Sequence, residues 1–502
     1  MPNPDPALCR DLAADLAAAG LRSSALRDAW GAEADDAVRR GLRTPGLRAL
    51  ADRDDALATL ARLLTLGRTQ PTEAVDRALP TARSRGLVAL GLAQRDGDLV
   101  RPVATIRPQD SLGAEWWIVA GLDELASDSG ALAEDFVLGV GRASLTLAGL
   151  QLPTPAGRVL DLGTGCGIQA LVARQHADAV VATDISEPAL ACARLTALLN
   201  GASGIETRRG SLFDPVAGET FDRIVSNPPF VITPRTADVP AYEYRDGGLV
   251  GDALVEQVVR GAGEHLVPGG ACQLLGNWET RDGVDGLDRV RAWVESSPVP
   301  LDAWVIERER LDPIAYAEMW IRDGGTVPGS PAHDRLLGAW LDDFAERGVT
   351  AVGFGYVLLR RAAGAPTLAR YERIPQPIPD ETALGAHLAD ALAVHDALAV
   401  VDDEALANAT LRVAPDVTEA RHHMPGEENP TLIELRQGAG FGRSVQADPA
   451  LAGLVGASDG ELTVGQIVGA LAQLLEVDEE ALSGSVLPAV RALLVDGFLR
   501  FA

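Results

Sequence analysis

The sequence has little positive charge, and all of it comes from arginine. Its 502 residues include 44 basic residues against 71 Asp and Glu, a formal net charge of −27. Lysine is absent, which we attribute to codon bias in a GC-rich genome rather than to a functional demand for guanidinium. A protein that binds nucleic acid through its phosphates needs a basic face. This balance therefore argues against a large nucleic-acid surface, although a local strip of arginines is still compatible with it.

Cysteine is scarce and scattered along the chain. The four cysteines form no CxxC pair and have no histidine nearby to complete a metal site. The adjacent His422 and His423 point in different directions and lack a third ligand close in sequence. We therefore expect reduced, buried thiols and no bound metal.

Long apolar runs and a secretion signal are also missing. No stretch reaches the roughly 18–20 apolar residues that cross a bilayer. The first ten residues, MPNPDPALCR, lack the basic start and apolar core of a signal peptide. The sequence therefore predicts a soluble, cytoplasmic protein that does not interact with membranes.

Hydrophobic residues make up 47% of the chain, enough for the cores of two or three domains. Residues 1–108 are predicted to form a mainly helical, winged-helix-like accessory domain, with a hairpin turning at Asp96-Gly97. Residues 109–362 alternate between strands and helices. Residues 363–502 begin with a Pro-rich linker and are predicted to be a second accessory domain, which ends in another winged-helix-like unit.

The central segment has the pattern of a parallel sheet covered by helices, because short apolar strands alternate with helical stretches. We predict an α/β, Rossmann-like fold with a sheet of seven strands and extra helical material at 313–346. The expected strands cover residues 158–163, 179–185, 205–210, 221–226, 269–278, 300–309 and 350–361.

The strongest local signal is a glycine-rich turn after the first strand, in the run VLDLGTGCG. Asp161 stands before the first glycine, where dinucleotide-binding folds usually have another glycine, and Ile168 does not fit their glycine spacing. A carboxylate suits the positive amino and sulfonium groups of S-adenosylmethionine, and it does not suit pyrophosphate. We predict a binding site for S-adenosyl-L-methionine formed by Asp161, Gly163, Thr164, Gly165, Gly167 and Ile168.

Two later strand ends are expected to complete the cofactor site. Asp184 ends the second strand, where a carboxylate can accept hydrogen bonds from both ribose hydroxyls, and Ile185 follows it. A helix-capping role for Asp184 is the alternative interpretation. Ser211 and Leu212 follow the third strand, where the adenine would lie, so that Leu212 can pack on the ring.

The tetrapeptide Asn227-Pro228-Pro229-Phe230 follows the strand at 221–226, at the sheet edge where open α/β folds bind ligands. The Asn227 side-chain carbonyl and the Pro228 main-chain carbonyl can each accept one N–H of a target amide or exocyclic amine. Proline fixes the backbone in advance, and Phe230 offers a ring face to a flat group. We predict that these four residues carry out methyl transfer to nitrogen, and that Asn227 also contacts the cofactor; a plain Pro-rich turn is the alternative.

Taken together, DLGTGCG, TDIS and SNPPF resemble the class I methyltransferases that modify nitrogen on planar polar groups. The sequence is most similar to release-factor and ribosomal-protein glutamine methyltransferases, and next to rRNA guanine exocyclic-amine methyltransferases. The similarity covers about residues 135–275 and the terminal pair of strands, and it implies that the last strand is antiparallel. The segment 137–145 corresponds to one that helps to cover the cofactor in the glutamine group, but it lacks that group's Pro-Arg-Pro-x-Thr signature.

Tyr244 and Arg245 follow the tetrapeptide in a glycine-rich segment that resembles one in the same family. We predict that both line the substrate entrance, with loop packing as the alternative.

A flat NH2 group fits a protein glutamine and a nucleobase equally well. The acidic composition favours a protein glutamine, with the flanking domains docking the partner protein. RNA is the second interpretation, and an arginine strip at Arg208, Arg209, Arg235 and Arg245 would favour it. Small-molecule N-methylation is a further alternative, whereas the intact Asp161, Asp184 and Asn227 argue against a non-catalytic binding module.

Overall fold

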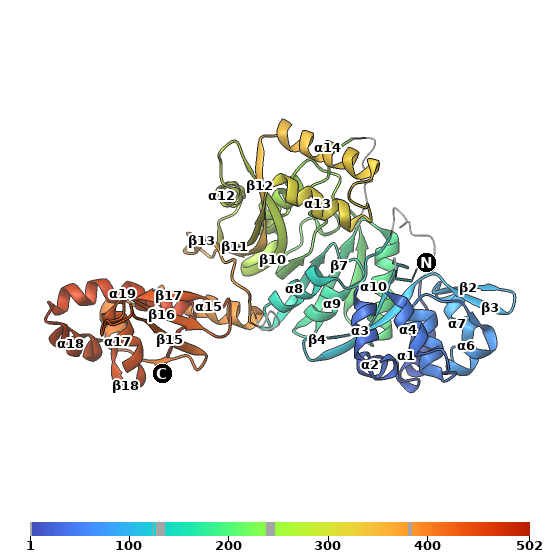
Figure 1. The fold of residues 1–502 in the computed structure, drawn as a ribbon, viewed down its shortest axis with the longest axis horizontal. Helices are drawn as coiled ribbons and strands as arrows, with labels where there is room; N and C mark the ends of the chain where they lie inside the picture. Colours follow the sequence, from blue (N-terminus) through green and yellow to red (C-terminus); the bar gives the residue numbers. More distant parts are fainter. Residues whose placement is uncertain (1–2, 124, 127–135, 237–245, 380–383) are drawn as a thin grey trace. The chain divides into compact units, whose positions relative to one another are not determined.

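The computed structural model describes residues 3–123, 125–126, 136–236, 246–379 and 384–502. The chain forms two compact units, residues 1–148 with 155–372 and residues 149–154 with 373–502. Figure 1 shows that both units mix helices and strands. Among the described residues, no helix is long and apolar enough to cross a membrane.

The first unit is built around an eight-stranded sheet in the order β13-β11-β12-β10-β9-β6-β7-β8. From β10 through β9, β6 and β7 to β8, neighbouring strands run parallel, whereas β12 is antiparallel to both β10 and β11. The bounds are β6 (Ala156–Leu162), β7 (Ala177–Asp184), β8 (Ile205–Arg209), β9 (Phe221–Ser226), β10 (Leu266–Arg281), β11 (Leu301–Leu311), β12 (Val349–Arg361) and β13 (Ala369–Arg373).

All seven predicted strands are present and the antiparallel last strand is confirmed, but the predicted count of seven is wrong. The eighth strand, β13, lies beyond the boundary predicted at residue 362 and pairs with the edge of β11. Asp302 in β11 accepts the main-chain N–H groups of Thr367 (2.7 Å) and Leu368 (3.0 Å). These contacts carry the chain past residue 362, so that the first unit ends at Glu372.

Helices pack on both faces of this sheet, because alternate strand residues point to opposite sides. On one face, Val159, Val180 and Val225 pack with residues of α9 (Ile168–Arg174). On the other face, Leu160, Val181 and Ile224 join the core that contains α11 (Ala253–Ala262) and α12 (Gly286–Glu295). The parallel strands β6, β7 and β9 are therefore covered on both sides.

Over residues 56–102 the N-terminal region consists of a helix, a short strand, two helices and a hairpin, in that order. The hairpin predicted at Asp96-Gly97 is present. Gly97 has a φ of +58° in its turn, which glycine adopts without strain. The winged-helix interpretation stays a prediction. The elements are α1 (Pro6–Ala18), α2 (Ser23–Trp30), α3 (Ala32–Arg39), α4 (Arg43–Ala49), α5 (Ala56–Leu60), β1 (Gln70–Pro71), α6 (Thr72–Ala78), α7 (Arg83–Ala89), β2 (Ala93–Asp96) and β3 (Leu99–Pro102).

The boundary predicted at residue 108 does not separate two compact units. A second hairpin, β4 (Thr105–Ser111) with β5 (Ala114–Ala120), contacts α10 (Glu187–Leu199) beside the sheet. Asn200 accepts the N–H of Trp117 (3.0 Å) and donates to its carbonyl (2.9 Å). One hydrophobic core runs through the N-terminal helices, this hairpin, α9 and α10. The first 120 residues are thus continuous with the central fold.

Two helices lie between β11 and β12 and form an insertion, as the sequence predicts for residues 313–346. They are α13 (Pro313–Asp323) and α14 (Pro331–Glu346), and Figure 1 shows them side by side. Asp312 caps α13 by accepting the N–H groups of Ile314 and Ala315, both at 2.9 Å. The insertion has its own buried aromatic core.

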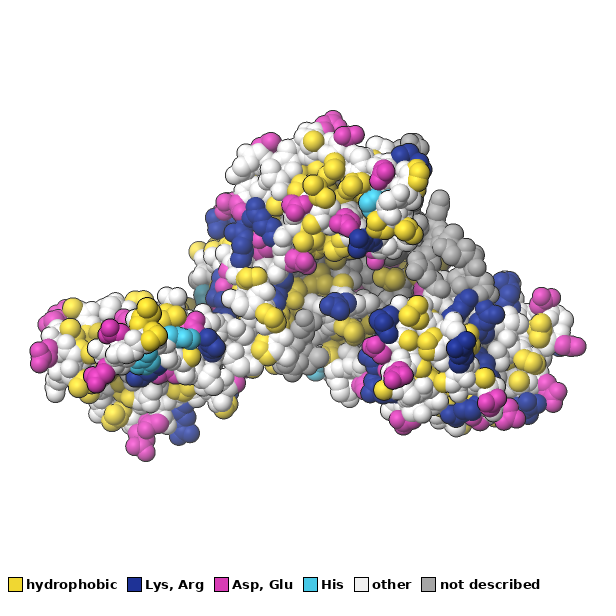
Figure 2. Space-filling model, in the orientation of Figure 1, with side chains coloured by type: hydrophobic (Ala, Val, Ile, Leu, Met, Phe, Trp, Pro, Cys, Tyr) yellow, Lys and Arg dark blue, Asp and Glu magenta, His cyan; other side chains and the backbone are white. Residues whose placement is uncertain are grey.

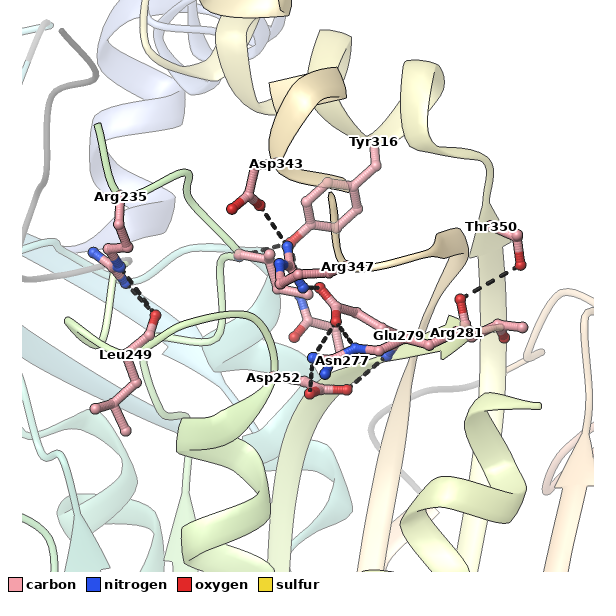
Figure 3. Close-up of polar contacts among 12 residues, drawn as sticks. Arg235, Leu249, Asp252, Asn277, Glu279, Arg281, Tyr316, Asp343, Arg347 and Thr350 are labelled. Carbon is pink, nitrogen blue, oxygen red and sulfur yellow. Dashed lines mark hydrogen bonds and ion pairs between the residues drawn. The ribbon is translucent and has the colours of Figure 1, made fainter. Parts of the chain in front are cut away.

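Buried charges tie this insertion to the sheet (Figure 3). Glu279 in β10 is fully buried, and its carboxylate accepts hydrogen bonds from Arg281 and from Arg347, the C-cap of α14. Asp252, before α11, accepts the N–H of Glu279 (2.8 Å) and pairs with Arg281 (2.9 Å). Each buried carboxylate therefore depends on neighbouring guanidinium groups.

Replacing Arg347 by methionine should lower the free energy of unfolding of the first unit by about 3 kcal/mol, because Glu279 loses a partner while it stays buried. Urea unfolding followed by tryptophan fluorescence measures this unit selectively, since all eight tryptophans lie in it. Arg322→Met is the control, because the Arg322–Glu318 pair is exposed and contributes little. Equal midpoints for the two variants would contradict the prediction.

The second unit ends in the helices and strand that the sequence predicts: α18 (Val464–Leu475), α19 (Glu479–Val495) and β19 (Leu499–Phe501). Thr463 and Gln466 form a capping box at the start of α18. The remaining elements are α15 (Leu384–Leu398), α16 (Asp403–Ala407), β14 (Thr410–Val413), β15 (Val417–His422), β16 (Leu432–Gln437), β17 (Ser444–Ala447), α17 (Pro449–Ala457) and β18 (Asp459–Thr463). The winged-helix interpretation of this end also stays a prediction.

Candidate active site

The carboxyl ends of β6, β7 and β9 lie next to one another in the sheet. Leu162 is in register with Thr183 on one side and with Ser226 on the other. The hydroxyl of Ser226 donates to the carbonyl of Leu162 (2.8 Å), a bond that joins β9 to β6 just before the tetrapeptide. The glycine loop, Asp184 and Asn227 therefore surround one pocket, with about 1230 Å³ of empty space including its open mouth. We call it the first pocket.

Most of the predicted site residues line the first pocket, and a few do not. Phe230 lies outside it, Asp161 is buried beneath the loop, and Gly167 packs between two helices. Tyr244 and Arg245 lie outside the described residues. Those that line the pocket are Gly163, Thr164, Gly165, Ile168, Asp184, Ile185, Ser211, Leu212, Asn227, Pro228 and Pro229.

The glycines of the loop have two different roles. Gly163 and Gly165 have φ values of +76° and +54°, and a Cβ atom added to either would meet nothing within 4 Å. Their bare backbone thus faces open space at the pocket. At Gly167, with φ +87°, an added Cβ would lie 3.0 Å from the Cα of Ala193. Gly167 therefore allows α9 and α10 to approach closely, and its place in the structure is a packing position.

Asp161 is fully buried under the loop and is only partly satisfied. Thr164 donates its hydroxyl proton to Oδ2 (2.6 Å), whereas Oδ1 accepts no hydrogen bond within the described part of the chain. Burial raises the pKa of Asp161 to about 7, because a desolvated carboxylate disfavours its charged form. A buried acceptor without a donor fits a cationic ligand group, which would supply the missing partner.

Asp184 binds the glycine loop with one carboxylate oxygen and the start of α10 with the other. Oδ2 accepts the N–H of Gly165 (3.0 Å), and Oδ1 accepts the N–H of Ser186 (2.9 Å). Ser186 is the N-cap of α10, so Asp184 precedes the helix and its cap residue. Burial raises its pKa above the ordinary value. Each oxygen accepts only one of these bonds, which leaves lone pairs for hydroxyl donors in the pocket.

The far end of the first pocket is lined by two apolar side chains. Ile185 is 49% exposed after β7. Leu212 has a φ of +45°, a conformation that costs free energy in a residue with a side chain and that is common at ligand sites. Together they offer an apolar surface for a flat ring.

The tetrapeptide separates the first pocket from a second cavity of about 1040 Å³, which also opens to solvent. Asn227, Pro228 and Pro229 line both spaces, and Phe230 lines only the second. Asn227 Oδ1 is buried and accepts no hydrogen bond from any residue that the structure describes. Asn227 therefore places a hydrogen-bond acceptor at the wall between the first pocket and the second cavity.

The chain after the tetrapeptide is held against it. Phe230 forms a main-chain β-bridge with Asp246, whose buried carboxylate pairs with Arg235. Arg235 also donates to the carbonyl of Leu249 (3.1 Å; Figure 3). Asp246 and Gly247 line the first pocket, next to the segment in which the sequence predicts substrate residues.

Several lining residues escape sequence reasoning. Val137, Leu138 and Gly139 belong to the segment that the resemblance indicated, but Phe136 before it gives no motif signal. Leu254 and Val258 lie one turn apart on α11 and look like ordinary core positions of an amphipathic helix. The others are Ser144, Leu162, Cys166, Gln169, Thr183, Ser186, Ala189, Gly210, Ser226, Asp246 and Gly247.

The strand order, the glycine loop and the Asn-Pro-Pro-Phe wall define a class I methyltransferase domain with S-adenosylmethionine as its cofactor. Comparison with known families agrees: residues 140–282 match the Methyltransferase small domain. Residues 18–103 match a domain of unknown function (DUF7059). The methyltransferase match ends at residue 282, just after β10 and before the insertion begins.

Two curated relatives match 24% and 34% of the chain. A ribosomal protein uL3 glutamine methyltransferase of Bradyrhizobium diazoefficiens is 39% identical over 131 residues, 24% of this chain and 40% of that protein. A ribosomal RNA small subunit methyltransferase C of Salmonella newport is 31% identical over 175 residues, 34% of this chain and 45% of that protein. The chain thus spans less than half the length of these curated relatives.

A solved structure of a T. thermophilus 16S rRNA methyltransferase (RsmC), in complex with S-adenosylmethionine and guanosine, is 20% identical. The alignment covers 49% of this chain and 66% of that one, with a TM-score of 0.28.

Proposed function

We propose that this protein is an S-adenosylmethionine-dependent N-methyltransferase that acts on a planar NH2 group, and that its acceptor is a protein glutamine. The observation that carries the proposal is Asn227, whose buried Oδ1 has no donor among the described residues and lies between two cavities. An acceptor oxygen in this place suits a target that brings its own N–H group.

The residues divide the work between the two spaces. Asp161 Oδ1 would hold the amino group of S-adenosylmethionine, Asp184 its ribose hydroxyls, and Ile185 with Leu212 its adenine. Asn227 Oδ1 and the Pro228 carbonyl would accept the two N–H groups of the acceptor, while Phe230 packs against its flat face. When bound, S-adenosylmethionine supplies an electrophilic methyl group.

The acceptor nitrogen attacks with the electron pair that its two hydrogen bonds leave directed towards the first pocket. Bound S-adenosylmethionine would supply the methyl group for an in-line displacement, and Asn227 with the Pro228 carbonyl would keep the nitrogen's electron pair directed at that methyl group. The nitrogen then carries positive charge and releases one proton to water. Asn227 and Pro228 stabilise that charge with fixed dipoles, so no strong general base is needed.

The arginines that would favour RNA are engaged with other groups. Arg208 pairs with Glu206 (2.8 Å) and with Glu219. Arg235 pairs with the buried Asp246, and Arg209 donates to the carbonyl of Ile185 (3.0 Å). Arg245 lies outside the described residues. On the face shown in Figure 2, arginine and acidic side chains are intermixed over the N-terminal helices. This distribution supports a protein acceptor.

The relatives support a macromolecular acceptor and give the order of candidates. The uL3 glutamine methyltransferase has the higher identity, at 39%, and its name states a glutamine acceptor. The ribosomal RNA methyltransferase makes RNA the second candidate. Both names refer to ribosomal components, so we place the reaction in the cytoplasm.

Methyl transfer to cell extract tests the proposal. Extract from a strain that lacks this gene is incubated with the protein and tritiated S-adenosylmethionine, then divided between protease and ribonuclease. We expect the label to become soluble only after protease treatment and to appear as methylglutamine after enzymatic digestion of the protein. Label released by ribonuclease would overturn the glutamine assignment, and label found only in small molecules would overturn any macromolecular acceptor.

A further inference from the structure

The second cavity is built by parts of the first unit that lie far apart in sequence. Leu125 comes from the N-terminal region, Phe136 and Leu138 from the segment before α8 (Arg142–Leu150) and β6, and Trp320 from α13. Asn227 to Val231 supply the floor. Three aromatic side chains, Phe136, Phe230 and Trp320, line this one space. Such a lining suits a flat, uncharged group.

Helix α13 contacts both this cavity and the chain that follows the tetrapeptide. Tyr316, Trp320 and Asp323 are spaced four and three residues apart, which places them on one side of the helix. Trp320 and Asp323 line the second cavity. Tyr316 is fully buried and packs edge-on against Trp320, with ring centroids 6.2 Å apart. One helix face therefore carries a cavity wall and a buried anchor.

Tyr316 holds the main chain two residues after Phe230. Its hydroxyl oxygen accepts the N–H of Ile232 (2.9 Å) and the side-chain N–H of Asn277 (2.7 Å). Figure 3 shows Tyr316 pointing from the insertion towards Asn277 in β10. Val231 and Ile232 are themselves buried in the aromatic core of the insertion, together with Trp340 and Phe344. The position of the tetrapeptide thus depends on the insertion as well as on β9.

We propose that α13 is the acceptor-recognition element of the enzyme. Trp320 and Phe230 form the walls of a slot for a neutral carboxamide side chain, and Tyr316 is a positioning residue that keeps the tetrapeptide at the wall between the two cavities. The proposal rests on the methyl transfer proposed above and adds the residues that select the acceptor. It also gives a role to the insertion, which lies outside residues 140–282, the range that matches the Methyltransferase small domain.

Two variants separate recognition from positioning. Trp320→Ala should raise the half-saturating concentration of the acceptor about tenfold, because one wall of the slot is lost. Trp320→Phe keeps an aromatic ring in the wall, so its half-saturating acceptor concentration should lie close to that of the wild type. Tyr316→Phe keeps the ring but removes the hydroxyl that accepts from Ile232, so kcat should fall about tenfold while the half-saturating acceptor concentration stays unchanged. Neither change should alter the Kd for S-adenosylmethionine.

The matched control is Trp340→Phe. Trp340 belongs to the same aromatic core and lies 5.8 Å from the Tyr316 ring, but it does not line the second cavity. It should leave kcat and acceptor saturation as in the wild type. The acceptor is the protease-sensitive fraction of the extract described above, used over a range of total protein concentrations.

The outcomes distinguish this inference from the proposed function. If the wild type neither binds S-adenosylmethionine in calorimetry nor labels extract, the proposed function fails. If the wild type labels protein and Trp320→Ala saturates like the wild type, with an unchanged melting temperature, the slot is wrong. If Trp340→Phe shifts saturation as much as Trp320→Ala, the effect belongs to the aromatic core and the recognition role of Trp320 is also wrong.

Discussion

Asn227→Ala should lower kcat by roughly 10²–10³-fold or more and leave the Kd for S-adenosylmethionine within about twofold. Asn227 Oδ1 is the buried acceptor at the wall between the two cavities. Removing it leaves one N–H of the target without a partner and lets the nitrogen rotate away from the methyl group. Cofactor affinity depends mainly on Asp161, Asp184 and the glycine loop, which the substitution does not touch.

Single-turnover labelling of extract gives the rate constant for this variant, and calorimetry gives its cofactor affinity. Asn227→Asp serves as the comparison, because a carboxylate keeps an acceptor oxygen at nearly the same place and should retain part of the activity. Turnover of the alanine variant at the wild-type rate would remove Asn227 from the reaction. Loss of cofactor binding would instead assign Asn227 to the first pocket alone.

The affinity for S-adenosylmethionine should weaken as pH falls below about 7, approaching tenfold per pH unit. Asp161 is buried with a raised pKa of about 7, so the free protein takes up a proton there in mild acid. A protonated carboxyl cannot pair with the ligand's amino group, and proton and ligand therefore compete. Asp161→Asn should bind roughly 10²-fold more weakly at pH 8 and lose most of this pH dependence.

The same substitution should stabilise the ligand-free protein. The folded-state pKa of Asp161 is about 7 and the ordinary value is 3.8, so the folded state binds more protons between these values. The stability that the protonated Asp161 contributes to the folded state is fully present below pH 3.8, and it is lost as the pH rises through about 7. At pH 8 the wild type must therefore keep a buried charge that asparagine does not carry.

Thermal unfolding at pH 8 without ligand should accordingly give a higher melting temperature for Asp161→Asn than for the wild type. Adding S-adenosylmethionine should reverse the order, because only the wild type gains its stabilisation. Asp178→Asn is a suitable control, since Asp178 is exposed near the opposite end of β7. A lower melting temperature for Asp161→Asn without ligand, or a flat pH profile for wild-type binding, would contradict the assignment of Asp161.

The parts of the fold that sequence reasoning predicted correctly are those in which neighbouring residues act together. The seven central strands show as short apolar runs, and the resemblance to class I methyltransferases implied that β12 is antiparallel. The glycine loop and the tetrapeptide are contiguous, and each follows an apolar strand, so their place at the sheet edge follows from strand direction alone. The helices at 313–346 show by their spacing of apolar residues.

The incorrect predictions arise where a contact joins distant residues. β13 is short and half-exposed, and its pairing with the edge of β11 makes it a strand. The boundary at residue 108 disappears because Asn200 and Thr196 bind the main chain of β5. The cofactor contact predicted for Gly167 stays a prediction, and the close packing of Gly167 against Ala193 in the next helix is a further long-range contact that the sequence does not reveal.

The sequence by itself determined the class of chemistry. Asp161 before the glycines and Asn227 before two prolines predict that chemistry from a few neighbouring residues. The backbone geometry that each motif requires spans only those residues. Tertiary structure alone decided which side chains line the second cavity. Tyr316 and Trp320 contact the tetrapeptide region across 84 and more residues of chain, with Tyr316 bound to Ile232. Packing of the insertion against β10 and β12 creates that contact, and no local pattern encodes it.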